Sequence, residues 1–239
     1  KKLTNEVIAL KCRKILALKY WSGLNRIDTI SKENIENDLS PAVNKALIND
    51  LYANALTVLN NNQNILPVKY LQNMRIATIG INRDNISGYQ ERVAKYHPAD
   101  HFLVNPSDTA ASGELLKKLA GYDLVIAGVF GLDQRPGMDF GIKPGLIEFL
   151  DKLIGNNKTI ITWFGNPYGI ARIKSLENAD GLVLAYQDNT YTGDLSAQLI
   201  FGGIGARGAL PVTISKKWPS DFGIITPGNL RLKYLTGEN

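Results

Sequence analysis

Apolar and polar stretches alternate along most of the chain in a pattern that predicts short strands and helices in turn. The expected strands are continuous apolar runs, at 56–59, 74–80, 102–104, 124–130, 159–164, 182–186 and 210–214. The expected helices have apolar positions at helical spacing and include 40–51, 87–96, 113–119, 144–154 and 194–201, with a short helix after Tyr168. Apolar strands that alternate with helices indicate an α/β fold, with a mostly parallel sheet covered on both faces. Because it contains Pro211, the strand 210–214 is predicted at a sheet edge.

A separate helix is predicted at the N-terminal end, over residues 4–20, with Thr4 as its N-cap and Gly23 as its stop. The polar segment 26–39 that follows is expected to be a linker. A lone helix cannot bury its own apolar face, so its partner is either the rest of this chain or a part that the sequence does not include. The next helix begins at Ser40 and Pro41. The positions that we expect it to bury are Val43, Leu47 and Leu51.

Composition narrows the class of protein. The chain has 239 residues, of which 44% are hydrophobic and 21% charged, as in ordinary globular proteins and unlike disordered chains. The net charge of +5 is spread without blocks of like sign, which argues against nucleic-acid binding. The longest apolar run, 124–130, is too short for a membrane span of about 18 residues. The single cysteine, Cys12, excludes an internal disulfide and a cysteine metal cluster.

Two features concern the ends of the chain. It begins at Lys1 rather than at a methionine, so we expect that it was processed or cut from something longer. The missing signal peptide therefore does not fix the compartment. The C-terminal residues 216–239 are predicted to be an irregular tail, and the apolar positions at 230–235 suggest continuation into a further domain.

Several familiar motifs are absent or misplaced. The glycines at 203, 205 and 208 spell G-x-G-x-x-G, but they follow a helix and precede a strand, which predicts a helix C-cap and turn rather than a dinucleotide site. His97 and His101 are four residues apart, but Pro98 breaks the helix that would join them, so we expect no metal site. There is no nucleotide P-loop and no G-x-S-x-G elbow. We expect no cofactor.

Two loops at strand ends carry the candidate binding residues, because ligands of open α/β sheets bind outside the carboxyl ends of strands. The turn 165–169 reads GNPYG, and Asn166 and Tyr168 offer an amide and a stacking ring that suit a sugar. The alternative is a purely structural tight turn. The longer loop 131–143 offers three charged candidates, Asp133, Arg135 and Asp139. Two acids near one arginine would be partly neutralised and good hydrogen-bond partners; the alternative is a solvated surface loop.

Four segments in the same order carry a resemblance to a known family. They are 13–24 (RKILALKYWSGL), 55–68 (ALTVLN and NILPV), 179–186 (ADGLVLAY) and 197–213 (AQLIFGG and GALPVT). Together they resemble the second domain of glycoside hydrolase family 3, over nearly the whole chain. The G-N-P-Y turn is most similar to the β-N-acetylglucosaminidase branch.

The resemblance implies a domain division and a fold. Residues 1–25 would be the last helix of a TIM-type catalytic barrel, and 26–39 a linker. Residues 40–215 would form a three-layer α/β sandwich with a mostly parallel sheet of about six strands, followed by the tail 216–239. The missing barrel is the implied partner, and a β-linked saccharide would bind at the domain junction. An exported bacterial protein, periplasmic or at the cell surface, is also implied.

The resemblance places no catalytic residue on this chain. Family members cleave β-linked sugars with retention, which requires two groups on opposite sides of the anomeric carbon. The family's Asp nucleophile lies on a barrel strand. In the β-glucosidase branch a Glu from a second-domain loop is the acid/base, but 131–143 contains no Glu. In the N-acetylglucosaminidase branch an Asp–His pair on a barrel loop transfers the proton. We therefore expect this chain alone to be inactive.

An alternative is a stand-alone carbohydrate-binding or interaction module without hydrolase activity. It predicts saccharide binding by the chain itself, abolished by Tyr168→Ala or Asn166→Ala. An unrelated doubly wound enzyme is disfavoured, because no nucleophile is placed beside a base.

Overall fold

The computed structural model describes residues 3–26 and 32–234 and divides the chain into two units, 1–42 and 43–239. The first unit contains the helices α1 (Asn5–Trp21) and α2 (Ile35–Leu39). Thr4 caps α1 as predicted, since its Oγ accepts the N–H of Val7, and Gly23 follows the helix with a φ of +80°. Within the first unit, α1 contains no buried residue. The predicted linker 26–39 contains α2, and its residues 27–31 lie outside the described part.

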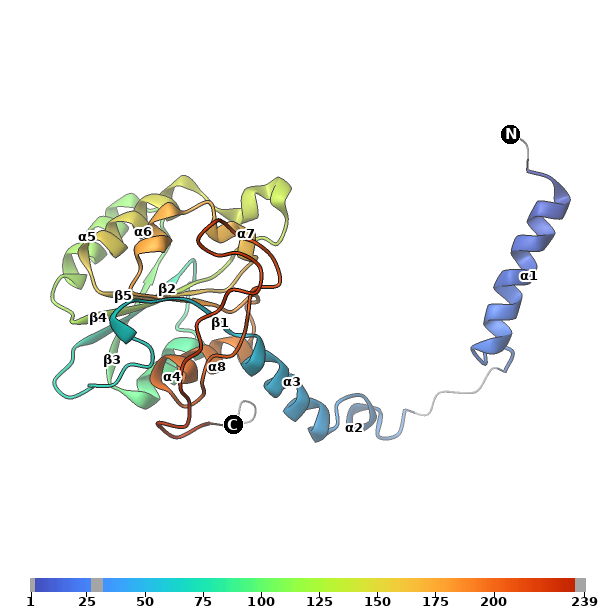
Figure 1. The fold of residues 1–239 in the computed structure, drawn as a ribbon, viewed down its shortest axis with the longest axis horizontal. Helices are drawn as coiled ribbons and strands as arrows, with labels where there is room; N and C mark the ends of the chain where they lie inside the picture. Colours follow the sequence, from blue (N-terminus) through green and yellow to red (C-terminus); the bar gives the residue numbers. More distant parts are fainter. Residues whose placement is uncertain (1–2, 27–31, 235–239) are drawn as a thin grey trace. The chain divides into compact units, whose positions relative to one another are not determined.

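The second unit is built on a six-stranded sheet in the order β1-β6-β5-β4-β2-β3 (Figure 1). The strands are β1 (Thr57–Asn61), β2 (Ile76–Ile81), β3 (Ala99–Val104), β4 (Leu124–Val129), β5 (Thr159–Trp163) and β6 (Gly181–Leu184). All pairings are parallel except that of the edge strand β1 with β6. This confirms the predicted mostly parallel sheet of about six strands.

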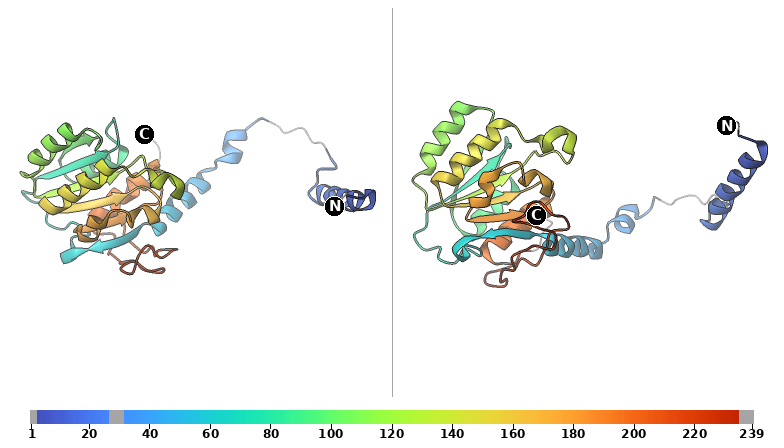
Figure 2. Two further views of the ribbon diagram at one scale, coloured as in Figure 1. Left: turned by 90° about the horizontal axis from the view of Figure 1, so that it is seen from above. Right: turned by 45° about the horizontal axis from the view of Figure 1, so that its top comes forward.

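Helices cover both faces of the sheet. They are α3 (Ala42–Ala55), α4 (Gly88–Tyr96), α5 (Thr109–Leu119), α6 (Pro144–Asn156), α7 (Pro167–Ile170) and α8 (Thr190–Phe201). The short 3-10 segments are η1 (Asn62–Asn64), η2 (Pro136–Gly141) and η3 (Lys174–Asn178). α5 and α6 pack on one face, and α4 and α8 on the other, as Figures 1 and 2 show. The predicted α/β sandwich of three layers is therefore confirmed.

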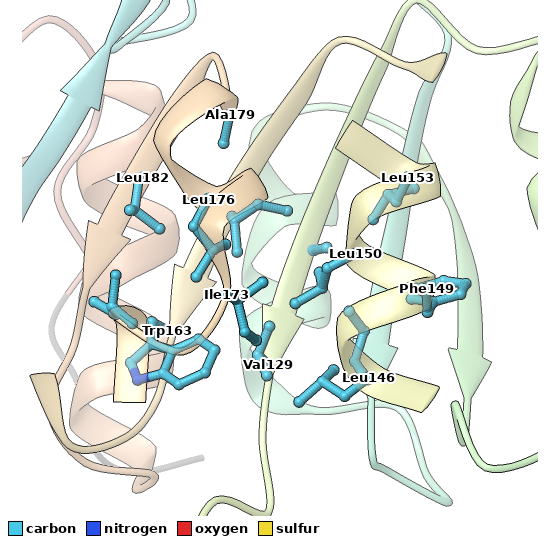
Figure 3. Close-up of a cluster of buried hydrophobic side chains, with 14 of the residues drawn as sticks. Val129, Leu146, Phe149, Leu150, Leu153, Trp163, Ile173, Leu176, Ala179 and Leu182 are labelled. Carbon is cyan, nitrogen blue, oxygen red and sulfur yellow. The ribbon is translucent and has the colours of Figure 1, made fainter. Parts of the chain in front are cut away.

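The α6 side of the core shows why these segments fold as they do. Leu146, Leu150 and Leu153 recur at helical spacing and point from α6 toward the sheet (Figure 3). Strand β5 contributes Trp163, whose side chain is completely buried. The inner strands β2, β4 and β5 are buried throughout and largely apolar because each is covered on both faces.

The expected strand at 210–214 is wrong. This segment makes its backbone hydrogen bonds locally, from Leu210 N–H to the Phe222 carbonyl (2.8 Å) and from Ile214 N–H to the Trp218 carbonyl (2.9 Å). Ile224 hydrogen-bonds to the edge strand β1 instead, since its N–H donates to the Val58 carbonyl (2.9 Å). Pairing within the C-terminal segment therefore replaces a seventh strand.

The expected burial of α3 is also wrong. Val43, Leu47 and Leu51 are 70%, 57% and 62% exposed. A different side of the helix packs on the core: Asn49 is buried, and Tyr52 lies against the hydrophobic cluster. Helical spacing identified an apolar stripe correctly, but the described residues of the second unit do not cover it.

The C-terminal segment from Lys216 to Tyr234 is irregular yet firmly packed on the second unit. Trp218 is buried and donates its Nε1–H to the Leu59 carbonyl (3.1 Å). Arg231 donates to the carbonyls of Val68 and Phe201, each at 2.6 Å. The segment thereby satisfies backbone carbonyls that the sheet and α8 leave open.

The G-x-G-x-x-G motif forms the turn after α8, as predicted. Gly202 ends the helix with a φ of +76°. A β-carbon on Gly208 would lie 2.5 Å from the carbonyl oxygens of both Ala55 and Leu56. The glycine is required here because two backbone segments approach closely, not because a nucleotide binds.

Gly208→Ala is expected to lower the free energy of unfolding by about 2 kcal/mol, because two backbone carbonyls would have to move. Gly113→Ala is the matched control: the site is inside α5, and an added β-carbon meets nothing within 4 Å. Alanine there is expected to stabilise the chain by up to about 1 kcal/mol. Denaturant unfolding measures both, and equal midpoints for the two variants would contradict the crowding argument.

Candidate functional site

The two loops that the sequence singled out lie side by side. They follow β4 and β5, which are neighbouring parallel strands, so their carboxyl ends meet at one edge of the sheet. Asn166 joins them, since its Nδ2 donates to the Gln134 carbonyl (3.1 Å). Its Oδ1 caps α7 by accepting the N–H of Tyr168 (3.0 Å), and its own carbonyl accepts the Nε1–H of Trp163 (3.0 Å). Both polar atoms of the Asn166 side chain thus help to hold the turn.

Asp133 and Arg135 form a two-bonded ion pair. Arg135 Nε lies 3.0 Å from Asp133 Oδ1, and Nη2 lies 2.8 Å from Oδ2. These hydrogen bonds, with one from the Arg135 backbone, lower the pKa of Asp133 to about 2. Asp139 does not share this arginine and pairs with Arg172 (3.1 Å), a residue that follows α7. The second ion pair therefore ties the two loops together again.

The backbone of loop 131–143 is held in an unusual shape. Asp139 and Phe140 have φ angles of 47° and 55°, a region that side chains other than glycine seldom adopt. Phe140 is buried in the core, and its carbonyl accepts the N–H of Asp133 (2.9 Å). Strain of this kind persists only where the surroundings fix it, and it concentrates at functional sites. The surroundings therefore fix the conformation of the loop, which exposes Met138 to solvent.

Tyr168 differs from the other four candidates. The residue is 45% exposed, and its side chain makes no hydrogen bond among the described residues. Asp133, Arg135, Asp139 and Asn166 engage one another or the neighbouring loop. The structure thus brings the five candidates together, with four acting as scaffold and one ring available for stacking.

Sequence reasoning missed a crevice between β2 and β4. Arg83 lies over the ring of Phe130 (4.6 Å to the centroid) and pairs with Asp188 across a hollow of about 470 Å³. A second hollow, of about 260 Å³, opens between Asn82 and Lys143. The connections from β2 and β4 leave on opposite faces, which is where open α/β sheets bind ligands. Only the strand order reveals this point, and the sequence does not give that order.

The described residues contain no group of three His, Cys, Asp or Glu that could hold a metal ion. His97 Nδ1 contacts the carbonyl of Pro98 (2.7 Å), whereas His101 Nδ1 lies 2.6 Å from Thr78 Oγ on β2. Within the described ranges, no helix is long and apolar enough to cross a membrane.

The Asp133 carboxylate gives a pH-dependent prediction. Its pKa is lowered, so the contribution of the ion pair is present above the usual pKa near 3.8 and is lost as the pH falls through about 2. In an NMR titration, Asp133 is expected to show a midpoint near 2, and Arg135→Met is expected to raise it toward 3.8, without reaching that value because the backbone N–H of residue 135 still donates to the carboxylate. Arg172→Met, which removes the partner of Asp139 only, should leave the Asp133 midpoint in place. An unchanged midpoint in Arg135→Met would contradict this cause.

Comparison with known proteins identifies the family of the second unit. The model of the glycosyl hydrolase family 3 C-terminal domain matches residues 56–230, nearly the whole second unit. The chain belongs to this family. The match includes β1 to β6, both candidate loops and most of the C-terminal segment. No curated protein matches the chain.

Similar solved structures include two family 3 enzymes. A fungal multi-domain GH3 β-N-acetylglucosaminidase has a TM-score of 0.65 and 19% identity, over 93% of this chain and 24% of that chain. A GH3 β-N-acetylglucosaminidase from Paenibacillus sp. str. FPU-7 has a TM-score of 0.66 and 12% identity, over 89% and 40%. The β-glucoside phosphorylase BglX follows at 0.64 and 16%, over 89% and 39%. At these identities the likeness shows the fold, and the chain spans only about a quarter to two fifths of these proteins.

Proposed function

We propose that this family 3 C-terminal domain is the non-catalytic domain of a retaining β-N-acetylglucosaminidase. In this proposal it supports a catalytic barrel and lends loops 131–143 and 165–169 to the sugar site. Asp133, Arg135, Asp139 and Asn166 hold the loops, while Tyr168 presents its ring to a β-linked saccharide.

The apolar stripe of α3 carries the proposal. Val43, Leu47 and Leu51 recur at helical spacing, and the rest of the second unit leaves them largely exposed. An apolar stripe on a helix is normally buried against another element. Within the first unit, α1 likewise presents apolar side chains, among them Ile8 and Leu16. Both surfaces suit contact with a further domain of the same polypeptide.

The charge state of loop 131–143 supports a non-catalytic role. A general acid must carry a proton near the working pH. Asp133, with a pKa of about 2, is ionised at neutral pH and bound to Arg135, and Asp139 is bound to Arg172. The loop contains no Glu. In this proposal the acids of this loop do not transfer the proton, and the group that does so lies on the barrel, as the resemblance to the β-N-acetylglucosaminidase branch implies.

The test begins with the reading frame upstream of Lys1. We expect about 250 residues of alternating strands and helices, the size of a TIM barrel. The longer polypeptide is expected to cleave 4-nitrophenyl N-acetyl-β-D-glucosaminide, and the present chain is not. Hydrolysis by the present chain, or a start codon directly before Lys1, would overturn the proposal.

A variant of α3 tests the supporting role. Leu47→Asp is expected to change the stability of the present chain by less than about 0.5 kcal/mol, because the site is exposed. In the longer polypeptide the same change is expected to lower the melting temperature clearly, by burying a charge against the barrel. Asn44→Asp, also exposed on α3, is the matched control and should leave both proteins unchanged.

A further inference from the structure

A polar hollow of about 260 Å³ lies at the carboxyl ends of β2, β3 and β4. The loops that follow these three strands supply its polar lining: Asn82, Asp84, Asn105, Ser107 and Lys143. The chain leaves β2 toward α4 on one face of the sheet and leaves β4 toward α6 on the other. The hollow therefore occupies the point where ligand sites form in open α/β sheets.

The hydrogen-bonding groups of this hollow are balanced between donors and acceptors. Among the described residues, neither the Asp84 carboxylate nor the Lys143 ammonium has a hydrogen bond or an ion pair. Asn82 donates its Nδ2 to the Phe130 carbonyl (3.1 Å), which leaves its Oδ1 free to accept. Asn105 accepts the N–H of Ser107 through Oδ1 (3.1 Å), which leaves its Nδ2 free to donate.

This balance discriminates between classes of ligand. An anion would meet the Asp84 carboxylate, and a cation would meet the Lys143 ammonium. A neutral polyol satisfies both, because each hydroxyl both donates and accepts. The volume lies below the range of about 300–1,000 Å³ typical of drug-sized ligands, which suits a single ring.

We propose that this hollow binds one ring of a saccharide, with Asp84 and Lys143 as its main hydrogen-bonding groups. The identification of the polyol as a sugar rests on the proposed function. The site is separate from Asp133, Arg135 and Tyr168, none of which lines it.

The experiment is an NMR titration of the ¹⁵N-labelled chain with N-acetyl-D-glucosamine. We expect a dissociation constant in the millimolar range, as for a small ligand, and shifts of the amides of Asn82, Asp84 and Ser107. Asp84→Asn and Lys143→Met are each expected to weaken binding about tenfold, since each loses a charged hydrogen-bond partner. The matched controls, Asp151→Asn and Lys158→Met, change exposed residues outside the hollow and should not alter binding.

Several outcomes would overturn the site. One is the absence of shifts at sugar concentrations tenfold above the millimolar range. Another is a set of shifts centred on Tyr168 and removed by Tyr168→Ala. Tighter binding of inorganic phosphate, or unchanged binding in both Asp84→Asn and Lys143→Met, would also exclude it. None of these results bears on support of a barrel, which the longer polypeptide and Leu47→Asp test separately.

Discussion

Replacing Trp163 by alanine is expected to lower the free energy of unfolding by about 4 kcal/mol. The indole is completely buried at the end of β5, between the sheet and the α6 layer (Figure 3). Its removal leaves a large cavity and also the Asn166 carbonyl without its Nε1–H donor. The variant is therefore expected to lose packing in the core and also to loosen the turn 165–169. Denaturant unfolding measures the first effect, and hydrogen exchange of the Tyr168 amide measures the second.

Trp21→Ala is the matched control for this variant. Trp21 is 85% exposed on α1, so its truncation should change the stability of the present chain by less than about 0.5 kcal/mol. Trp163→Phe keeps most of the volume but not the donor, and separates the two contributions. A loss below about 1 kcal/mol in Trp163→Ala would contradict the packing argument. A turn that exchanges no faster in either Trp163 variant would contradict the anchoring role of the indole.

The sheet was predictable from the sequence because parallel strands covered on both faces consist largely of apolar residues. All six strands lie on predicted runs, with ends shifted by at most three residues. The segment 210–214 has the same apolar character, but its donors pair with 218–222. Local composition predicts that a segment can adopt an extended conformation, but it does not predict which other segment will form its hydrogen bonds. Val43 on α3 illustrates the same limit, since helical spacing identifies an apolar stripe but not the part of the protein that packs against it.

The candidate loops were predictable for a topological reason, whereas their pairing was not. Residues after strands β4 and β5 must meet at one edge if these strands are parallel neighbours. Asp139 pairs with Arg172 across the two loops, a contact between positions far apart in the sequence. The hollow at Asn82 and Lys143 depends on the strand order, in which β2 lies between β3 and β4. No pattern within one segment contains that information.

The ion pair of Arg92 and Asp194 joins α4 to α8 and gives the second large prediction. Arg92 Nε contacts Asp194 Oδ1, and both side chains are largely buried. Gln198 donates to Asp194 Oδ2 (2.8 Å) and also bonds the backbone of Tyr234, at 2.9 and 3.0 Å. The Arg92 guanidinium lies over the Tyr234 ring, 4.3 Å from its centroid. One buried network thus links two helices to the C-terminal segment.

Asp194→Ala is expected to lower the free energy of unfolding by about 3 kcal/mol, because it leaves a buried guanidinium without its carboxylate. The double variant Arg92→Met, Asp194→Leu is expected to lose less, about 1 kcal/mol, since it removes both charges and keeps the volume. Glu148→Ala is the control: it breaks the exposed pair with Lys152 and should cost less than about 0.5 kcal/mol.

The comparison of single and double variants decides what the network does. If the two side chains contribute only through packing, the double variant should be as unstable as Asp194→Ala. That result would contradict the argument that an unpaired buried charge causes the loss. If pairing dominates, the double variant recovers most of the loss. The amide of Tyr234 should exchange faster in Asp194→Ala, because Gln198 loses the carboxylate that holds it. Protection of that amide in Asp194→Ala would mean that the C-terminal segment is held by Arg231 and Trp218 without this network.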